Sequence, residues 1–205
     1  IVLYLYWMKN YKNYKNYLYY LKNGIDKLDL SKLQKIENII FNKIKKNKKI
    51  FVCGNGGSAA VANHFLCDFN KGIKLSSENK LKPKIISLSN NIEMILALSN
   101  DISFNKIFSF QLDNYYSKGD IVIFLSCSGS SPNIIETLEY CKKKKIFTIS
   151  FTGFAKKKNQ KKANINLNLD IENYGVAEDF FQVIMHMISQ SIRLKFIKNK
   201  KKIIL

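Results

Sequence analysis

The sequence predicts an α/β protein in which a parallel, mostly five-stranded sheet lies between two layers of helices, with further helices at the N-terminal end. Three observations lead to this three-layer α/β/α sandwich. Short apolar runs typical of buried strands alternate with segments of helical periodicity. Two of these runs end in loops rich in glycine or serine, and a helix-like segment follows each loop. The 205 residues are enough for a single domain with one core.

The N-terminal part is expected to be helical. Residues 8–22 are rich in aromatic residues and lysine. Ser31, followed by Gln34, forms a capping-box pattern. Apolar residues then recur at helical spacing, at Leu33, Ile36, Ile39, Ile40 and Ile44. Residues 1–7 are apolar, but they are too short to span a bilayer and lack the features of a signal peptide. We interpret them as the product of an upstream or mis-set start, with Met8 as the biological start.

Residues 47–197 are expected to form the α/β core of one domain that covers residues 8–197. Strands are predicted at 49–53, 83–88, 120–126, 146–151 and, at the sheet edge, 164–171. Helices are predicted at 58–70, 93–98, 105–116, 132–140 and 177–197. A polar loop is expected at 155–163, and residues 198–205 read as a lysine-rich tail. Strands that alternate with helices imply a parallel sheet covered on both faces.

The formal net charge of +19 is carried almost entirely by lysine, because Arg193 is the only arginine in the chain. A strong positive charge is typical of nucleic-acid or membrane-surface partners. Base readout and bidentate phosphate contacts favour arginine over lysine, however. Lysine is also enriched from end to end. We interpret the charge as compositional bias, and we expect neither a nucleic-acid nor a membrane partner.

The cysteine pattern argues against a disulfide scaffold. The chain has four cysteines and no CxxC pair: Cys53, Cys67, Cys127 and Cys141. Small secreted scaffolds have denser, patterned cysteines. We therefore expect reduced thiols in a cytoplasmic protein. Apart from the N-terminal run, no segment approaches the roughly 18 apolar residues of a membrane-spanning helix.

The first of the two loops follows the strand predicted at 49–53 and reads Gly54-Asn55-Gly56-Gly57-Ser58. Glycines let the backbone approach a ligand closely. The N–H groups at the start of the next helix are free to bind an anion. The loop is neither GxGxxG nor a P-loop with its lysine, so a dinucleotide or nucleoside triphosphate site is poorly supported. On its own, the loop is explained equally well as a tight turn between strand and helix.

The second loop follows the clearest strand and reads Ser126-Cys127-Ser128-Gly129-Ser130-Ser131-Pro132-Asn133. Its hydroxyls can donate hydrogen bonds to a phosphate, and the following helix N-terminus adds a favourable field. Ligands of open α/β sheets bind beyond the carboxyl ends of the strands. Both loops are expected there, so they are predicted to face one crevice that binds a phosphate.

The two histidines of the chain are the main acid–base candidates. His64 lies four residues before Asp68, on the same face of a predicted helix. His186 lies on the last helix, two turns after Glu178. Each histidine has apolar neighbours in the sequence, and each alone is explained as an interior or interface residue. The alternative is that the two helices bring these four side chains to one pocket, where a carboxylate and a histidine suit proton transfer.

Taken together, GNGGSAAVANHF and FLSCSGSSPN resemble the sugar isomerase (SIS) domain family, whose fold is flavodoxin-like (Rossmann-like). Within that family the sequence resembles the phosphoheptose isomerases from Met8 to about Ile197, including the segments SNDISFNKIF and IENYGVAEDFFQVIMHMISQ. The resemblance implies an aldose–ketose isomerase that converts D-sedoheptulose 7-phosphate to D-glycero-D-manno-heptose 7-phosphate through an enediol intermediate. This reaction supplies heptose for lipopolysaccharide and related glycans.

The resemblance also implies roles for individual residues. Acid–base work would be done by Asp68 and His186. The phosphate would be held by Ser126, Ser128 and Ser131, with Cys127 in the same loop. The sugar side would be lined by Asn55, Gly56, Gly57 and Ser58. Further substrate contacts would be Asn100, Asp101 and Glu178, although a plain turn or cap explains the first two equally well. Some relatives bind zinc, and the matching ligand set here is His64, Asp68, Glu178 and His186.

Two positions depart from the pattern of the family. Asp68 stands where the family has glutamate, and Glu178 stands where phosphoheptose isomerases commonly have glutamine. The resemblance further implies a homotetramer in which the helices of residues 8–46 pack together. SIS domains also occur as phosphosugar sensors without catalysis and as isomerases of other sugar phosphates. Both alternatives stay open at this point.

Overall fold

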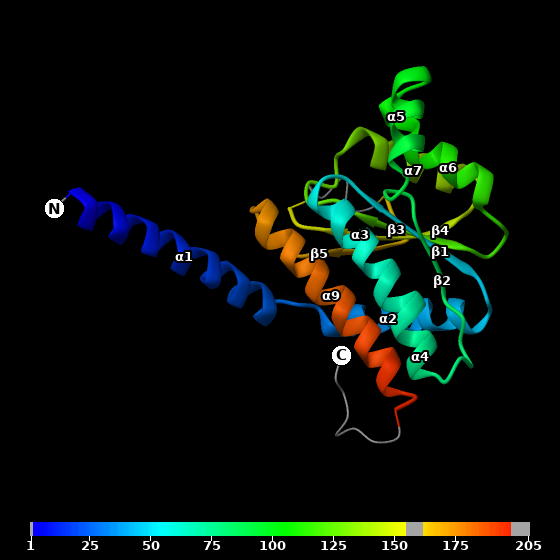
Figure 1. The fold of residues 1–205 in the computed structure, drawn as a ribbon, viewed down its shortest axis with the longest axis horizontal. Coiled ribbons are helices and arrows are strands. Elements are labelled where there is room, and N and C mark those ends of the chain that lie inside the picture. Colours follow the sequence, from blue (N-terminus) through cyan, green and yellow to red (C-terminus); the bar gives the residue numbers. More distant parts are fainter. Residues whose placement is uncertain (1, 155–161, 198–205) are drawn as a thin grey trace.

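The computed structural model describes the backbone of residues 2–154 and 162–197 and the side chains of residues 13–154 and 162–197. Its centre is a sheet of five parallel strands in the order β2-β1-β3-β4-β5 (Figure 1). The strands are β1 (Lys49–Gly54), β2 (Lys84–Ser87), β3 (Ile121–Leu125), β4 (Phe147–Thr152) and β5 (Ile165–Asn168). All five predicted strands are present, and the last one lies at the sheet edge as predicted.

Helices cover both faces of the sheet (Figure 1). One face carries α2 (Leu30–Lys45), α3 (Gly57–Cys67) and α9 (Tyr174–Leu194). The other carries α5 (Ile92–Asp101), α6 (Ile107–Tyr115) and α7 (Pro132–Lys143). The remaining elements are α1 (Val2–Asp26), the π-helical turn η1 (Asp68–Ile73), the short α4 (Lys74–Ser76) and the 3-10 turn η2 (Phe104–Lys106). The predicted three-layer α/β/α sandwich is therefore confirmed.

Strand β3 shows why the sheet needs both layers. Its residues are all fully buried, and successive side chains of a strand point to opposite faces. Ile123 belongs to the core beneath α2, α3 and α9, whereas Phe124 belongs to the core beneath α5, α6 and α7. A continuous apolar run is what a central parallel strand requires.

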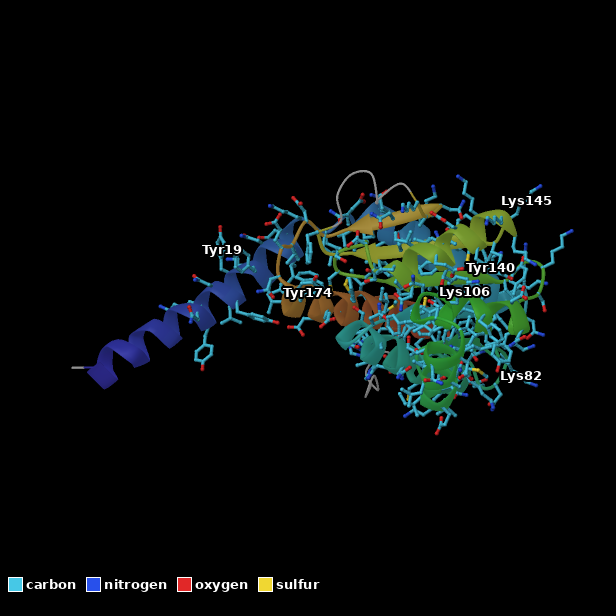
Figure 2. The ribbon with its side chains drawn as sticks, turned by 90° about the horizontal axis from the view of Figure 1, so that it is seen from above. Tyr19, Lys82, Lys106, Tyr140, Lys145 and Tyr174 are labelled. Carbon is cyan, nitrogen blue, oxygen red and sulfur yellow. The ribbon has the colours of Figure 1, made fainter. Side chains whose placement is uncertain are left out.

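Helix α1 leaves the body of the molecule, and only its C-terminal part packs on α9 (Figure 1). There Gly24 lies against the ring of Phe180, and the hydroxyl of Tyr17 donates a hydrogen bond to Asp179 Oδ2 at 2.6 Å. Tyr19, near this contact, is 62% exposed (Figure 2). The helix is longer than the predicted 8–22. The interpretation of residues 1–7 as an upstream start stays a prediction.

The start of α2 corrects one prediction. The N-cap is Asp29, whose carboxylate accepts a hydrogen bond from the backbone N–H of Lys32 at 2.8 Å. Ser31 lies within the first turn, so its pairing with Gln34 as a capping box was wrong. The physical reason is position, because the helix begins at Leu30 and its third N–H is already bound by Asp29.

The predicted helix 58–70 also differs from what the structure shows. Helix α3 ends at Cys67, and the chain continues through the wider turn η1 into α4. Residues 155–161 of the predicted loop and residues 198–205 of the lysine-rich tail lie outside the described residues. All four cysteines are free thiols. Among the described helices, none combines the length and the apolar character needed to cross a membrane.

Candidate functional site

The two loops meet at the carboxyl edge of the sheet because β1 and β3 are adjacent strands. Gly54 at the end of β1 pairs in register with Leu125 at the end of β3. Beyond these ends, the side-chain amides of Asn55 and Asn133 exchange two hydrogen bonds of 2.9 Å. The start of α3 is thereby tied directly to the start of α7, which confirms that the loops face one crevice.

A pocket of about 230 Å³ lies between the two loops, and both contribute to its wall. The described residues that line it are Asn55, Gly56, Ser58, Leu125, Ser126, Cys127, Ser128, Ser131, Tyr174 and Glu178. The hydroxyl oxygen of Ser126 is buried here and makes no hydrogen bond to another described residue. A buried hydroxyl without a partner is costly, so Ser126 is a group that a ligand in this pocket would satisfy.

The serine loop surrounds the start of α7 with neutral polar groups. Its N-cap, Ser131, makes no side-chain capping bond, and Pro132 occupies the first turn. Gly129 has a φ of +61°, which lets the loop turn sharply before the helix. The hydroxyl of Ser128 accepts bonds from the backbone N–H and the hydroxyl of Ser130. In the first turn of α7, Pro132 has no N–H and the N–H of Ile134 donates to Asn133 Oδ1 at 2.9 Å. The features that suit a phosphate here are therefore the hydroxyls and the positive end of the helix dipole.

The glycine loop is different, because a carboxylate from α9 already sits at the start of α3. Glu178 Oε1 accepts hydrogen bonds from the backbone N–H of Ser58 at 3.0 Å and from its hydroxyl at 3.2 Å. Next to this group, burial and then the charge of Glu178 raise the pKa of the Cys127 thiol to about 11. Cys127 therefore stays protonated at neutral pH, and it lines the pocket as a neutral group.

A second group of polar side chains lies further along the same pair of helices. His64 Nε2 and His186 Nε2 are 3.0 Å apart. Asp68 Oδ2 lies 3.4 Å from the first nitrogen and 3.2 Å from the second. The imidazole side chains of His64 and His186 are 50% and 41% exposed. Neither histidine is therefore an interior residue, which was one of the two explanations that its apolar sequence neighbours supported. The structure brings these three predicted residues together in what we call the histidine–aspartate cluster.

Gln182 is a member of this region that the sequence reasoning missed. Its side-chain amide lies 2.9 Å from His186 Nε2. The spacing of four residues on one helix was the available signal, because residues i and i+4 share a face. Glu178 is one turn further back on α9 and is bonded to Ser58 instead. The structure therefore does not bring Glu178 into the predicted metal set.

The chemistry of the histidine–aspartate cluster fits a divalent metal ion. His64, Asp68 and His186 each offer one ligand atom, and these atoms lie within 4.8 Å of one another. Asp68 Oδ2 is buried and has no conventional hydrogen bond among the described residues, although both imidazoles are near. Two imidazole nitrogens and a carboxylate oxygen are typical ligands of zinc, with a fourth position left for water or substrate.

Two predicted contact residues lie elsewhere. Asn100 and Asp101 are at the end of α5, where the amide of Asn100 donates to Asp101 Oδ1 at 2.8 Å. Both are at least partly exposed, and neither lines the described pocket between the loops. A helix-end pair explains their geometry within one chain.

The fold and the site define an α/β protein with a pocket whose polar groups suit a phosphate, beside a cluster suited to acid–base or metal chemistry. The sequence profile of the SIS domain matches residues 13–153. A probable phosphoheptose isomerase of Thermoplasma acidophilum is 33% identical over 169 residues, which are 82% of this chain and 91% of the relative. The phosphoheptose isomerase of Aliarcobacter butzleri is 32% identical over 160 residues, 78% of this chain and 83% of the relative.

The fold comparison agrees. The structure of a phosphoheptose isomerase from Neisseria gonorrhoeae superposes with a TM-score of 0.76 at 21% identity, covering 90% of this chain and 97% of that one. The chain belongs to the SIS domain family, in its phosphoheptose isomerase branch.

Proposed function

We propose that this protein is an aldose–ketose isomerase that converts D-sedoheptulose 7-phosphate to D-glycero-D-manno-heptose 7-phosphate. One observation carries the proposal. The phosphate-type pocket and the histidine–aspartate cluster are both built on α3 and α9, at different points along the two helices. A substrate with a phosphate at one end and a carbonyl at the other would reach both.

The spacing of the two regions suits a sugar of this length. Glu178 lines the pocket and His186 lies eight residues later on α9, which is about 12 Å along a helix. An extended chain of eight bonds, from the first carbon of a heptulose to the phosphorus on its seventh, spans roughly 9–10 Å at the reach per bond of an extended backbone. A phosphate in the serine loop would therefore place the reacting carbons beside the histidine–aspartate cluster.

The proposed chemistry assigns one proton transfer to each catalytic residue. The carboxylate of Asp68 takes a proton from the carbon next to the carbonyl, which gives the enediol intermediate. His186 moves a proton between the two enediol oxygens, and return of a proton to the neighbouring carbon completes the aldose. The 3.2 Å between Asp68 Oδ2 and His186 Nε2 places both groups at one reacting centre.

A zinc ion is part of the proposal as an option that the donor set supports. His64, Asp68 and His186 would hold it. The bound ion would polarise the substrate carbonyl as a Lewis acid. Gln182 lies beside His186 and is close enough to orient its ring.

We also propose that the molecule assembles as a homotetramer through its N-terminal helices. Helix α1 carries large exposed side chains, among them Tyr14, Leu18, Tyr19 and Tyr20. Several large exposed apolar side chains on one helix are typical of an interface. In such an assembly Asn100 and Asp101, on the exposed end of α5, keep their predicted role as substrate contacts. The cytoplasmic location stays a prediction.

The direct test is incubation of the protein with sedoheptulose 7-phosphate, with and without added zinc, and detection of the aldose phosphate. We expect turnover in at least one condition. Absence of product under conditions in which a characterised phosphoheptose isomerase is active would refute the proposal.

A second candidate function is a phosphosugar-binding module without catalysis. The observation in its favour is Asp68, whose side chain is one methylene shorter than the glutamate of the family pattern, and a misplacement of about 1 Å can cost on the order of a hundredfold in rate. This function predicts sugar phosphate binding by calorimetry that persists in Asp68→Asn and His186→Asn, with no turnover in the unmodified protein.

A further inference from the structure

The start of α3 already binds an anionic group of the protein itself, the carboxylate of Glu178. The N-terminus of a helix favours negative charge, because its N–H groups are unpaired and its dipole is positive. Gly56, the N-cap of α3, has no side chain to fill this role. Glu178 fills it from α9, through the backbone N–H and the hydroxyl of Ser58.

Gly57 shows that this contact is built into the fold. A Cβ placed on Gly57 would lie 2.8 Å from Glu178 Oε1 and closer still to Oε2. Real side chains do not approach so closely, so a Cβ at this position would displace the carboxylate from Ser58, and glycine leaves room for it. The glycine loop therefore serves the close approach of a side chain from the same chain, and the start of α3 is already occupied.

The neighbouring helix start is the opposite case. The groups at the start of α7 are neutral, because Pro132 has no N–H and the amide oxygen of Asn133 accepts a hydrogen bond from the N–H of Ile134 at 2.9 Å. Ser126 lines the shared pocket, and its buried hydroxyl has no described partner. Adjacent strands lie about 4.8 Å apart, and β1 and β3 deliver α3 and α7 to neighbouring positions at the sheet edge. Two helix starts at this separation, both without an anion, would suit a ligand with two linked phosphate groups. Here the start of α3 already holds the carboxylate of Glu178.

We propose that Glu178 determines specificity by restricting this pocket to a single phosphate group. A monophosphate ester places its anion against the serine loop, and the neighbouring hydroxyl of the sugar meets the carboxylate, which accepts hydrogen bonds. A diphosphate would place its second anionic group at the start of α3, where Glu178 repels it. The site therefore accepts monophosphorylated sugars and rejects pyrophosphate and sugars linked through a diphosphate. The inference rests on the proposed phosphate pocket, but it needs no catalytic step.

The test compares the binding of inorganic phosphate and pyrophosphate by calorimetry, in the full chain. Unmodified protein should bind pyrophosphate no more tightly than phosphate. Glu178→Gln removes the charge and keeps an oxygen that accepts from Ser58. We expect it to tighten pyrophosphate binding at least about tenfold and phosphate binding no more than about threefold, because like charges a few ångströms apart in a partly buried pocket repel on that scale.

Two control variants isolate the cause. Glu172→Gln removes a charge from an exposed position six residues earlier, and it should leave the ratio of the two affinities unchanged. Glu178→Asp keeps the charge and should keep the preference of the unmodified protein. Thermal unfolding of each variant shows that the fold is retained.

Several outcomes would overturn the inference. These are an unchanged affinity ratio in Glu178→Gln, an equal change in Glu172→Gln or Glu178→Asp, a marked preference of the unmodified protein for pyrophosphate, or no binding of either anion. Failure of the proposed function looks different, because phosphate would still bind with the predicted preference while sedoheptulose 7-phosphate is not turned over.

Discussion

The two halves of the candidate site are built from different materials. Apart from the carboxylate of Glu178, the pocket between the loops is lined by uncharged residues, and Ser58 and Ser126 in its wall are buried. The histidine–aspartate cluster consists of titratable groups, and its two imidazoles are 50% and 41% exposed. Neutral groups can bind a charged ligand without changing their own protonation. Groups that transfer protons in a reaction must be able to gain and lose a proton. In the proposed reaction, this difference would separate substrate binding from proton transfer along α3 and α9.

The largest expected effect comes from the cluster. His186→Asn and Asp68→Asn should each lower kcat by about 10²- to 10⁴-fold, the usual contribution of a general acid or base. KM should change little, because the phosphate pocket is untouched. Steady-state kinetics with sedoheptulose 7-phosphate checks this. Asp179→Asn, an exposed carboxylate on the same helix, serves as the control. A change in KM without a change in kcat would show that Asp68 and His186 bind the substrate and do not take part in the proton transfers.

The next effect belongs to the pocket. Ser126→Ala should raise KM about ten- to a hundredfold and leave kcat nearly unchanged, because a hydrogen bond to a charged ligand contributes about 1.5–3 kcal/mol. Stability should hardly change, since the hydroxyl of Ser126 has no described partner to lose. Ser109→Ala removes an equally buried hydroxyl on α6 and should leave KM as it is. An unaltered KM in Ser126→Ala would place the phosphate elsewhere.

The contact between Gly57 and Glu178 is tested by its effect on the free energy of unfolding. Gly57→Ala forces the new Cβ against Glu178 and should lower the free energy of unfolding by about 1–3 kcal/mol, the cost of overpacking. Combined with Glu178→Ala, the penalty should largely vanish, because the clashing atoms are gone. Gly72→Ala is the matched control, since its Cβ would meet its nearest neighbour at an ordinary 3.5 Å. Urea unfolding of the single and double variants measures the coupling, and additive effects would argue against the contact.

A smaller effect is expected at Gln182. Gln182→Leu keeps the size of the side chain and removes its hydrogen bond to His186, so kcat should fall about three- to tenfold, the equivalent of one ordinary hydrogen bond. Gln190→Leu on the same helix should leave kcat unchanged. An effect as large as that of His186→Asn would make Gln182 a participant in the chemistry.

The smallest effect is expected where α1 meets α9. Asp179 accepts a hydrogen bond from Tyr17 and thereby raises the pKa of that phenol to about 12. The folded state holds this proton more tightly than the unfolded state, so the contribution is complete below pH 10 and is lost as pH rises through about 12. Absorbance titration of the unmodified protein and of Asp179→Asn should show one tyrosine moving to lower pKa in the variant. Tyr17→Phe should cost less than about 1 kcal/mol, because the pair is exposed.

Local patterns predicted the strands and the two loops well, because a buried run such as β3 and a serine-rich helix start carry their signal in consecutive residues. The bond from Ser58 to Glu178 spans 120 positions, and no local pattern encodes it. The position of Gln182 depended on knowing which turn of α9 faces α3. At α2, two residues with capping chemistry lay two positions apart, and only the structure showed that Asp29 takes the role.

The π-helical turn after α3 has a consequence for how this chain tolerates change. Turn η1 begins at Asp68 and contains Phe69 and Ile73, both fully buried. One residue of an α-helix corresponds to about 100° of rotation, and π-turns are usually a single extra residue within a helix. Deleting one residue between Asp68 and Ile73 would therefore rotate the rest of the segment by about 100° relative to α3. The carboxylate of Asp68 could then stay beside His186, or the apolar side chains could stay in the core, but not both. We therefore expect this segment to tolerate substitutions better than insertions or deletions.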